Sequence, residues 1–369
     1  MSRPTVRAAV LYPDQTVTVT EVVLDPPGPG EVEVEIAAAG VCRSDLHAIE
    51  GHWPVPVPAV LGHEGAGIVT SLGAGVTGLE VGDHVVLSWI PVCGDCRHCA
   101  ARRPWLCEPA DELIFAQGVL YDGTSRWHQG DDRLHHFFGV SAFAERVVVP
   151  ASGAIPIRRD APLDVVAIVG CAVATGVGTV LNTAQVPAGA ELAVIGCGGV
   201  GLSCIQGARI AGAARIVAVD VNPAKLAVAK ALGAHDTVDV SQADTVIALR
   251  DLQPAGFDYV IDAIGHVETT EQAIAAIGMG GAAVIVGAPR AGETARFDPL
   301  ALVDAGQRIL GSNYGSTDPR RDFPRLVDRY MTGELDLDAL ISGSRPLTEL
   351  DQALEQLAGG QALRTLLIP

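Results

Sequence analysis

Residues 192–201 read Leu-Ala-Val-Ile-Gly-Cys-Gly-Gly-Val-Gly, a short apolar run that leads directly into a glycine-rich turn. The spacing of the glycines allows a tight turn, a close approach of phosphate to the backbone, and close packing of a helix on a strand. A helical pattern begins near Val200, so a pyrophosphate would lie at a helix N-terminus, where free N–H groups favour negative charge. We predict a dinucleotide site made by Gly196, Gly198, Gly199, Val200 and Gly201.

Asp220 ends the next apolar run, nineteen residues after Gly201. A carboxylate at this place accepts hydrogen bonds from ribose hydroxyls and repels a 2′-phosphate. No arginine follows it immediately, and Lys225 is one of only two lysines in the chain. We therefore predict NAD over NADP and include Lys225 in the site. The alternative is that Asp220 is a helix-cap or turn residue before Pro223.

Around this turn, short β-branched runs alternate with helical patterns from about residue 172 onward. We expect strands at 192–195, 216–219, 259–261 and 283–286, and helices at 200–211, 223–232 and 269–277. Such alternation predicts a parallel sheet with right-handed crossovers, buried on both faces.

The two ends of the chain have a different pattern. The first 155 residues predict β-strands at 17–22, 31–36, 84–87 and 144–149, and the last 55 predict helices around 323–331 and 350–357 with a closing strand at 363–368. Between Cys107 and Phe143 the sequence is polar with little periodicity, which predicts a long functional or subunit-contact loop. We predict an α/β protein: a β-rich domain of residues 1–171 and 314–369, interrupted by a doubly wound Rossmann domain of residues 172–313.

Composition narrows the class of protein. The 369 residues are 49% hydrophobic and carry a formal net charge of −18, which disfavours nucleic acid and anionic lipid as partners. The N-terminal Met1-Ser-Arg-Pro lacks a secretory signal, and no run approaches roughly 18 apolar residues, so we expect no membrane span and a cytoplasmic protein. In a reducing compartment, clustered cysteines more often bind metal than form disulfides.

Half of the eight cysteines form one C-x2-C-x2-C-x7-C run: Cys93, Cys96, Cys99 and Cys107. Four thiolates can close a tetrahedral shell around one zinc ion and leave no position for substrate, so this site is predicted to be structural. Stray thiols or a disulfide pair do not explain the spacing, and the acidic chain disfavours a nucleic-acid-binding zinc ribbon.

Cys42, His63 and Cys171 are the candidates for a second metal site. Each of the first two stands among polar residues, in Cys42-Arg-Ser-Asp-Leu-His47 and Gly62-His-Glu-Gly65. A lone cysteine or histidine is more often an ordinary buried residue, and Cys197 and Cys204 are interpreted in that way.

These motifs together resemble the zinc-dependent medium-chain alcohol dehydrogenases nearly end to end, and residues 122–126 and 135–139 resemble the longer-loop branch that includes the liver-type enzymes. The resemblance implies a GroES-like catalytic domain with two zincs per chain. Cys42, His63 and Cys171 would bind the catalytic zinc with one position open, and hydride would pass from an alcohol to NAD. It also implies a homodimer, with a tetramer as the alternative.

The resemblance also implies further roles. Asp45 would orient His63, Glu64 would support or transiently replace a zinc ligand, and Ser44 and His47 would carry the alcohol proton to the surface. Arg43 and Arg364 would pair with the pyrophosphate, and Thr175 and Val200 would pack behind the nicotinamide.

The substrate is predicted from departures from the pattern. The glutathione-dependent branch carries an acidic residue after the relay histidine and an arginine after the structural cysteines, whereas Trp53 and the acids Asp111 and Glu112 stand in the comparable stretches. We expect a neutral primary alcohol or aldehyde, medium-size or bulky, in an apolar pocket whose candidate residues are Trp53, Trp89, Leu113 and Val140. These four could instead be core residues.

Three alternatives remain at this point. The chain could oxidise the aldehyde adduct of another small thiol, or dismutate aldehydes with tightly held NAD. It could also be a catalytically silent scaffold, which would predict loss of a catalytic ligand.

Overall fold

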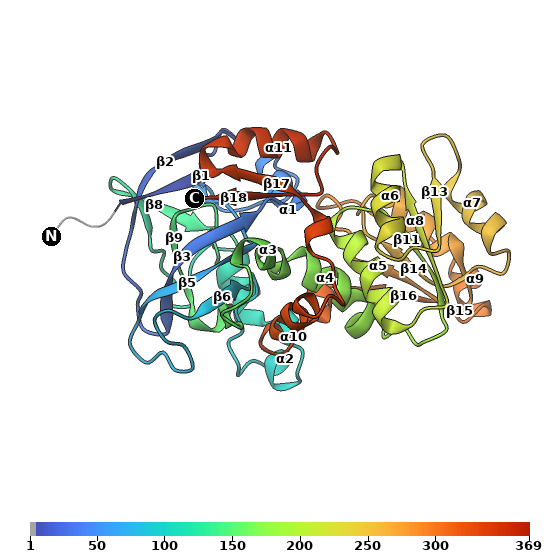
Figure 1. Cartoon of the computed structure of the whole chain (residues 1–369), viewed down its shortest axis with the longest axis horizontal. Helices are drawn as coiled ribbons and strands as arrows, with labels where there is room; N and C mark the ends of the chain where they lie inside the picture. The colour runs from blue at the N-terminus through green and yellow to red at the C-terminus, as the bar shows by residue number, and fades with distance from the viewer. Residues whose placement is uncertain (1–4) are drawn as a thin grey trace. The chain divides into compact units, whose positions relative to one another are not determined.

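The computed structural model describes residues 5–369, so the first four residues used in the N-terminal signal prediction lie outside the described part. The chain forms two compact units, Met1–Cys171 with Asp318–Pro369, and Ala172–Thr317 (Figure 1). The second boundary lies four residues after the one expected from the sequence. The reason is local, because Thr317 donates a hydrogen bond to the carbonyl oxygen of Ala174 and Asn182 donates to that of Gly315.

The unit Ala172–Thr317 contains one parallel sheet of order β13-β12-β11-β14-β15-β16. The strands are β11 (Glu191–Ile195), β12 (Arg215–Asp220), β13 (Asp236–Asp239), β14 (Phe257–Asp262), β15 (Ile277–Ile285) and β16 (Arg308–Gly311). The helices are α4 (Ala172–Gly178), α5 (Gly199–Ala211), α6 (Pro223–Ala231), α7 (Thr245–Leu252), α8 (Val267–Ala276) and α9 (Pro299–Asp304). This strand order is that of the doubly wound dinucleotide-binding fold.

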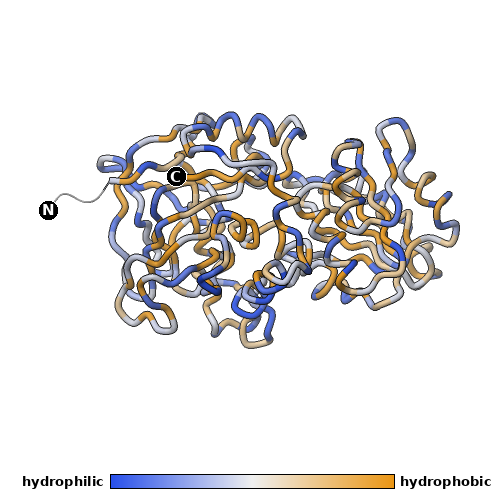
Figure 2. The backbone as a smooth tube through the Cα atoms, viewed as in Figure 1, coloured by the Kyte–Doolittle hydropathy of each residue, from blue (hydrophilic) through white to orange (hydrophobic). Residues whose placement is uncertain are grey.

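The apolar runs that predict these strands supply the core of that unit. Ile195, Val217, Val219 and Val260 are among the fully buried side chains that pack together. Figure 2 shows the same apolar segments along the strands. Because helices cover parallel strands on both sides, the strands are apolar throughout and do not alternate.

The other unit contains a closed barrel and a larger sheet. The barrel order is β1-β2-β7-β8-β4, with strands β1 (Thr5–Leu11), β2 (Val17–Leu24), β4 (Ala59–Val60), β7 (Trp127–Gln129) and β8 (Asp132–His136). The seven-stranded sheet has the order β10-β6-β5-β3-β18-β17, with β9 also paired to β3. Its strands are β3 (Glu31–Gly40), β5 (Gly65–Leu72), β6 (His84–Leu87), β9 (Arg146–Pro150), β10 (Ala154–Pro156), β17 (Ile341–Pro346) and β18 (Arg364–Ile368).

Strand β18 joins the C-terminus to this sheet by pairing with β3, so both ends of the chain build one unit. The helices of this unit are α1 (Arg43–Ile49), α2 (Arg97–Ala100), α3 (Leu163–Val166), α10 (Pro319–Met331) and α11 (Leu350–Ala358). In the described part, no single helix is long and apolar enough to cross a membrane. The bent pair Leu163–Gly170 and Ala172–Thr183 would be long and apolar enough together, by length and composition only.

The segment 107–143 differs from its prediction as an irregular loop. It contains a π-helical turn, Ala110–Phe115, and the antiparallel hairpin β7–β8, which completes the barrel. The hairpin was missed because its strands are short and rich in histidine and aspartate, so its pairing with β2 and β4 does not appear as an apolar alternation.

Candidate metal centres and dinucleotide turn

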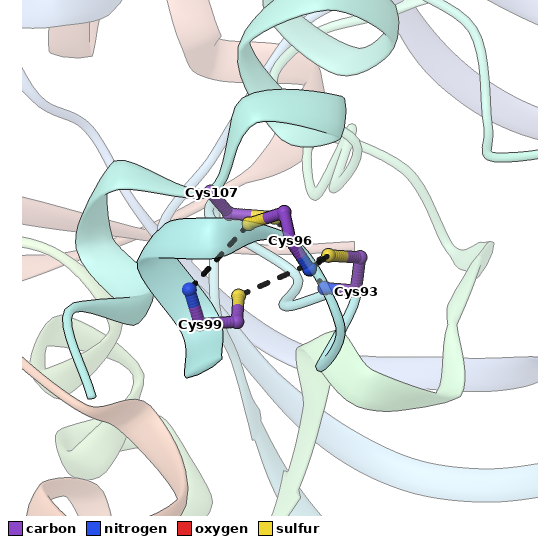
Figure 3. Close-up of side chains that lie close together, drawn as sticks. All are labelled: Cys93, Cys96, Cys99 and Cys107. Carbon is purple, nitrogen blue, oxygen red and sulfur yellow. Dashed lines mark hydrogen bonds between the residues drawn. The ribbon is translucent and has the colours of Figure 1, made fainter. Parts of the chain in front are cut away.

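The Cys93–Cys107 loop holds four sulfur atoms around one point. All four Sγ atoms lie within 4.8 Å of one another, and the Cys93 and Cys99 sulfurs are 3.9 Å apart. The side chains point toward a common centre (Figure 3). Zinc–sulfur bonds of about 2.3 Å place tetrahedral sulfurs about 3.8 Å apart, so the cluster fits zinc.

The backbone of this loop turns toward the same sulfurs. The N–H groups of Cys93, Cys96 and Cys99 donate to the sulfurs of Cys107, Cys93 and Cys96 at 3.4, 3.3 and 3.5 Å. Such bonds stabilise negative charge on sulfur. An exposed ion pair, Arg97 with Glu108 at 2.6 Å, also lies within the loop.

The second group, Cys42, His63 and Cys171, comes from three separate segments of one unit. Cys42 lies between β3 and α1, His63 between β4 and β5, and Cys171 follows the 3-10 turn Ala167–Gly170. Their ligand atoms lie within 4.8 Å of one another, and all three side chains are buried.

Asp45 connects two of these residues. Its Oδ1 accepts a hydrogen bond from Nδ1 of His63 at 3.1 Å, and its Oδ2 accepts one from the backbone N–H of Cys42 at 2.9 Å. Because Nδ1 is used in this way, Nε2 is the ring nitrogen of His63 that is left to bind a metal ion. Nε2 is buried and has no hydrogen-bond partner. Two sulfurs and one unpartnered imidazole nitrogen are a donor set that zinc accepts.

The electrostatics of this site attract a cation. Burial lowers the pKa of His63, but the charge and hydrogen bond of Asp45, helped by Cys42, outweigh burial and raise it to about 10. The pKa of the Cys42 thiol lies well below its usual value, mainly because Cys171 donates a hydrogen bond to its sulfur. Burial acts in the opposite direction, and the nearby charge of Arg364 lowers the pKa further. A divalent cation supplies the positive charge that these groups favour.

Glu64 and Arg364 form a buried ion pair beside the ligands. Nε of Arg364 lies 3.0 Å from Oε2 of Glu64, and their side chains are 4% and 0% exposed. Nη2 of Arg364 donates to the Cys42 sulfur at 3.3 Å. The sequence suggested only a pyrophosphate contact for Arg364, because nothing in the local pattern indicates a partner 300 residues away.

Helix α1 carries the residues of the suggested proton path. The Cys42 sulfur lies 3.7 Å from the Ser44 hydroxyl, and the indole of Trp53 packs at a tilt against the ring of His47, with the ring centroids 4.9 Å apart. Burial, followed by the nearby Arg43 and His52, lowers the pKa of His47. Arg43 itself is exposed.

An aromatic cluster lies against the ring of His63. Phe138 is 5.6 Å from that ring, and the rings of Trp89 and Phe115 lie 5.9 and 5.1 Å from Phe138. Phe115 and Phe138 were missed as pocket candidates. For Phe138 there was a usable signal, because aromatic residues are only 4% of the chain and two of them are adjacent in His135-His-Phe-Phe.

Two further pocket candidates, Leu113 and Val140, are aliphatic and take no part in the ring contacts of the aromatic cluster. Leu113, in the π-helical turn, is half-buried, while Val140 is 1% exposed and its N–H donates to the carbonyl oxygen of Phe137. Val140 therefore has the burial of a core residue.

The geometry of the glycine-rich turn requires glycine at two positions, Gly196 and Gly201. Gly196 has a φ of +97°, and a Cβ on Gly201 would lie 1.8 Å from the carbonyl oxygen of Gly196. A Cβ on Gly198 would meet nothing within 4 Å, which leaves the backbone open to a ligand. The turn fits a pyrophosphate at the start of α5.

Asp220 holds this turn in place. Its Oδ2 accepts from the N–H of Cys197 at 2.7 Å and its Oδ1 from the N–H of Asn222 at 2.9 Å. The cap of α6 is Asn222, which accepts from the N–H of Ala224, so Asp220 is not the cap residue. Lys225 is half-buried on α6.

Thr175 and Val200 lie on α4 and α5, which cross closely. A Cβ on Gly176, the neighbour of Thr175, would lie 2.4 Å from the carbonyl oxygen of Val200. The contact explains a glycine inside α4. Thr175 itself is 8% exposed.

Two candidate metal centres, a candidate dinucleotide turn and these two folds together indicate a zinc-containing oxidoreductase. Residues 28–159 match the alcohol dehydrogenase GroES-like domain, and residues 199–332 match the zinc-binding dehydrogenase domain. A probable S-(hydroxymethyl)glutathione dehydrogenase of Schizosaccharomyces pombe is 37% identical over 98% of this chain and 96% of its own.

Solved structures agree with this assignment. An alcohol dehydrogenase zinc-binding domain protein from Burkholderia ambifaria has a TM-score of 0.94 at 36% identity, and benzyl alcohol dehydrogenase from Acinetobacter calcoaceticus has 0.93 at 32%, each covering 99% of both chains. The chain belongs to the zinc-dependent medium-chain alcohol dehydrogenase family. It is an enzyme that uses zinc and a nicotinamide dinucleotide, which sets aside the silent-scaffold alternative.

Proposed function

We propose that this chain is an NAD-dependent alcohol dehydrogenase that interconverts a bulky or aromatic primary alcohol and its aldehyde at the Cys42–His63–Cys171 zinc. The observation that carries the substrate class is the cluster of Trp89, Phe115 and Phe138 against His63. Aromatic side chains favour a flat apolar ligand over a charged thiol adduct.

In this proposal Cys42, His63 and Cys171 would hold the zinc, which would supply a Lewis acid for the substrate oxygen, and the glycine turn would hold the dinucleotide, which would supply the hydride acceptor. Asp45 keeps His63 in the tautomer and orientation that bind the metal. Ser44 accepts the proton of the substrate, and His47, whose pKa is lowered, passes it on toward solvent. Arg364 balances the charge of Glu64 and the Cys42 sulfur and would reach the pyrophosphate together with Arg43.

The substrate test compares kcat/KM for benzyl alcohol, hexanol and ethanol. We expect benzyl alcohol to lead, and Phe138→Ala to reduce its advantage over ethanol by about tenfold, since removing one aromatic contact costs about 1–3 kcal/mol. Trp105→Leu, in the structural zinc loop, is the control. An unchanged preference in Phe138→Ala would contradict the proposal.

A second candidate is the oxidation of a thiol adduct of formaldehyde, favoured by the 37% identity to the probable S-(hydroxymethyl)glutathione dehydrogenase. One feature counts against this candidate. Its substrate carries carboxylates, whereas Asp111 and Glu112, in the stretch after the structural cysteines, are exposed acids that would repel them. Rates with formaldehyde that rise with added glutathione or another small thiol would favour this candidate. Dismutation would instead proceed without added NAD.

We further propose NAD as the preferred dinucleotide, because the Asp220 carboxylate ends β12 beside the glycine turn. Like-charge repulsion against a 2′-phosphate costs several kcal/mol, so Asp220→Asn should raise kcat/KM for NADP relative to NAD by about 100-fold. Asp239→Asn, an exposed carboxylate at the end of β13, serves as the control. An unchanged ratio would remove Asp220 from the specificity site.

We propose a cytoplasmic homodimer, with a tetramer as the alternative. All eight cysteines are free thiols, which suits a reducing compartment. Strand β16 is a sheet edge, and Met279 on the adjacent β15 and Leu300 and Val303 on α9 are 67–84% exposed. Sedimentation should give twice the chain mass, and Val303→Glu should reduce it; a monomeric wild type would contradict the proposal.

A further inference from the structure

The turn after α1 brings three metal-binding side chains together outside both cysteine sites. Glu50 follows the helix, and Gly51, with a φ of +69°, turns the chain back against the last turn of α1. The N–H groups of His52 and Trp53 then donate to the His47 carbonyl oxygen at 2.9 and 3.2 Å. As a result, ligand atoms of His47, Glu50 and His52 lie within 4.8 Å of one another.

The contacts among these three side chains exceed what hydrogen bonds can satisfy. Nδ1 of His52 lies 3.2 Å from Nδ1 of His47 and 3.1 Å from Oε2 of Glu50. A ring nitrogen offers one in-plane direction, which holds either a proton or a lone pair. Nδ1 of His52 can therefore satisfy only one of its two short contacts. One cation at the centre would accept the lone pairs of all three atoms.

The spacing also agrees with a zinc-type ion. Ligands bound at about 2.0–2.1 Å in a tetrahedral shell lie about 3.3 Å apart. Two imidazoles and one carboxylate are a donor set that zinc uses with a fourth position left to water. The side chains of His52 and Glu50 are 21% and 46% exposed, so an ion can enter from solvent.

We propose that His47, Glu50 and His52 bind a third divalent cation of the zinc type, and that its binding withdraws His47 from proton transfer. Because thiolates are absent from this set, its affinity is lower than that of the two cysteine sites. The site fills when free zinc rises and then slows the enzyme. The effect on the rate rests on the proposed function, whereas the metal binding does not.

Metal content gives the first test. Protein carrying its tightly bound zinc is dialysed against increasing free Zn²⁺, and we expect one further equivalent to bind. Glu50→Gln and His52→Gln should each weaken this equivalent by about tenfold or more. His128→Gln is the matched control, because His128 contacts Asp25 at 2.8 Å with similar exposure but without a third donor. Absence of the further equivalent, or its persistence in both variants, overturns the inference.

Cobalt gives a test that does not depend on the rate. Co²⁺ at the third site should show visible bands without the near-ultraviolet charge-transfer bands that thiolate ligands produce. Thiolate bands on the third equivalent would place it at a cysteine site and overturn the inference.

Inhibition tests the second half of the inference. Added Zn²⁺ should inhibit alcohol oxidation over the range in which the third equivalent binds, and His52→Gln, compared with its own rate without added zinc, should need about tenfold more. Binding without inhibition overturns the withdrawal of His47. A wild type inactive on every alcohol counts against the proposed function, while dialysis still decides the metal site.

Discussion

The two cysteine-containing sites use similar ligands but are built in opposite ways. The structural loop collects four sulfurs within residues 93–107 and supports them with its own backbone N–H groups. The Cys42–His63–Cys171 site takes its ligands from three segments, and it also includes Asp45 and the Glu64–Arg364 pair. The first site depends on a local turn, whereas the second depends on the tertiary fold of its unit.

The difference also appears in solvent exposure. Three of the four loop cysteines are half-buried, while the ligands of the second site are 1–7% exposed. A site in an exposed loop can stabilise the fold, but a dry site makes charge effects strong enough for chemistry. Breaking one ligand in each site should therefore have different consequences.

The largest effect is expected from Cys42→Ser. Loss of the proposed catalytic zinc would remove several kcal/mol of charge stabilisation, so kcat/KM for alcohol oxidation should fall about a thousandfold or more. Zinc per chain should fall from two to one. Cys204→Ala, a buried cysteine of α5 outside both sites, is the control and should keep both zincs. A Cys42→Ser enzyme with two zincs and an unchanged rate would contradict the assignment.

Cys99→Ser should have the reverse profile. It also leaves one zinc, but the loss falls on stability, with a thermal midpoint lower by roughly 5–10 °C. The rate per remaining zinc, measured well below the midpoint, should stay much closer to wild type than in Cys42→Ser. Equal losses of rate in the two variants would abolish the distinction between the sites.

Ion pairs near the two sites sharpen the comparison further. Glu64→Gln removes the carboxylate partner of the buried Arg364, which then keeps only the Cys42 sulfur, and should lower the free energy of unfolding by roughly 3–5 kcal/mol. Glu108→Gln breaks the exposed pair with Arg97 and should change it by less than about 1 kcal/mol. Denaturant unfolding measures the free energy of unfolding of both variants. Similar losses of stability in the two would contradict this prediction.

The last prediction concerns how the stability of the protein depends on pH, and it compares the buried histidines His63 and His136. Asp45 raises the pKa of His63 to about 10, whereas burial, aided by Arg126, lowers that of His136 to about 3. His136 is thus neutral when folded but binds a proton when unfolded below about pH 6.5. Its contribution to stability is complete at high pH and is lost as the pH falls.

The measurement compares wild type with His136→Gln. Between pH 7 and pH 5.5, the free energy of unfolding of the wild type should fall by about 1.3 kcal/mol more than that of the variant. Parallel pH curves would show that His136 is charged in the folded protein.

Much of the fold follows from local sequence patterns. The strand at His84–Leu87 agrees with its predicted bounds, and α5, α6 and β11 differ from theirs by one residue. Hydrophobic period and glycine spacing decide such elements within a few residues. The hairpin β7–β8 and strand β17 were missed because their strands are short and mostly polar, so they show no apolar run or alternation.

The same limit applies to the sites. The spacing of Cys93, Cys96, Cys99 and Cys107 by itself predicted a metal loop, and the glycines of residues 196–201 predicted a dinucleotide turn, because each prediction needs only neighbouring residues. Only the tertiary structure decided that Arg364 meets Glu64, that Phe138 lies between His63 and Trp89, and that Gly51 folds His52 back against His47. Contacts between distant segments depend on how strands pair and on which side chains are buried together, and no local pattern encodes that.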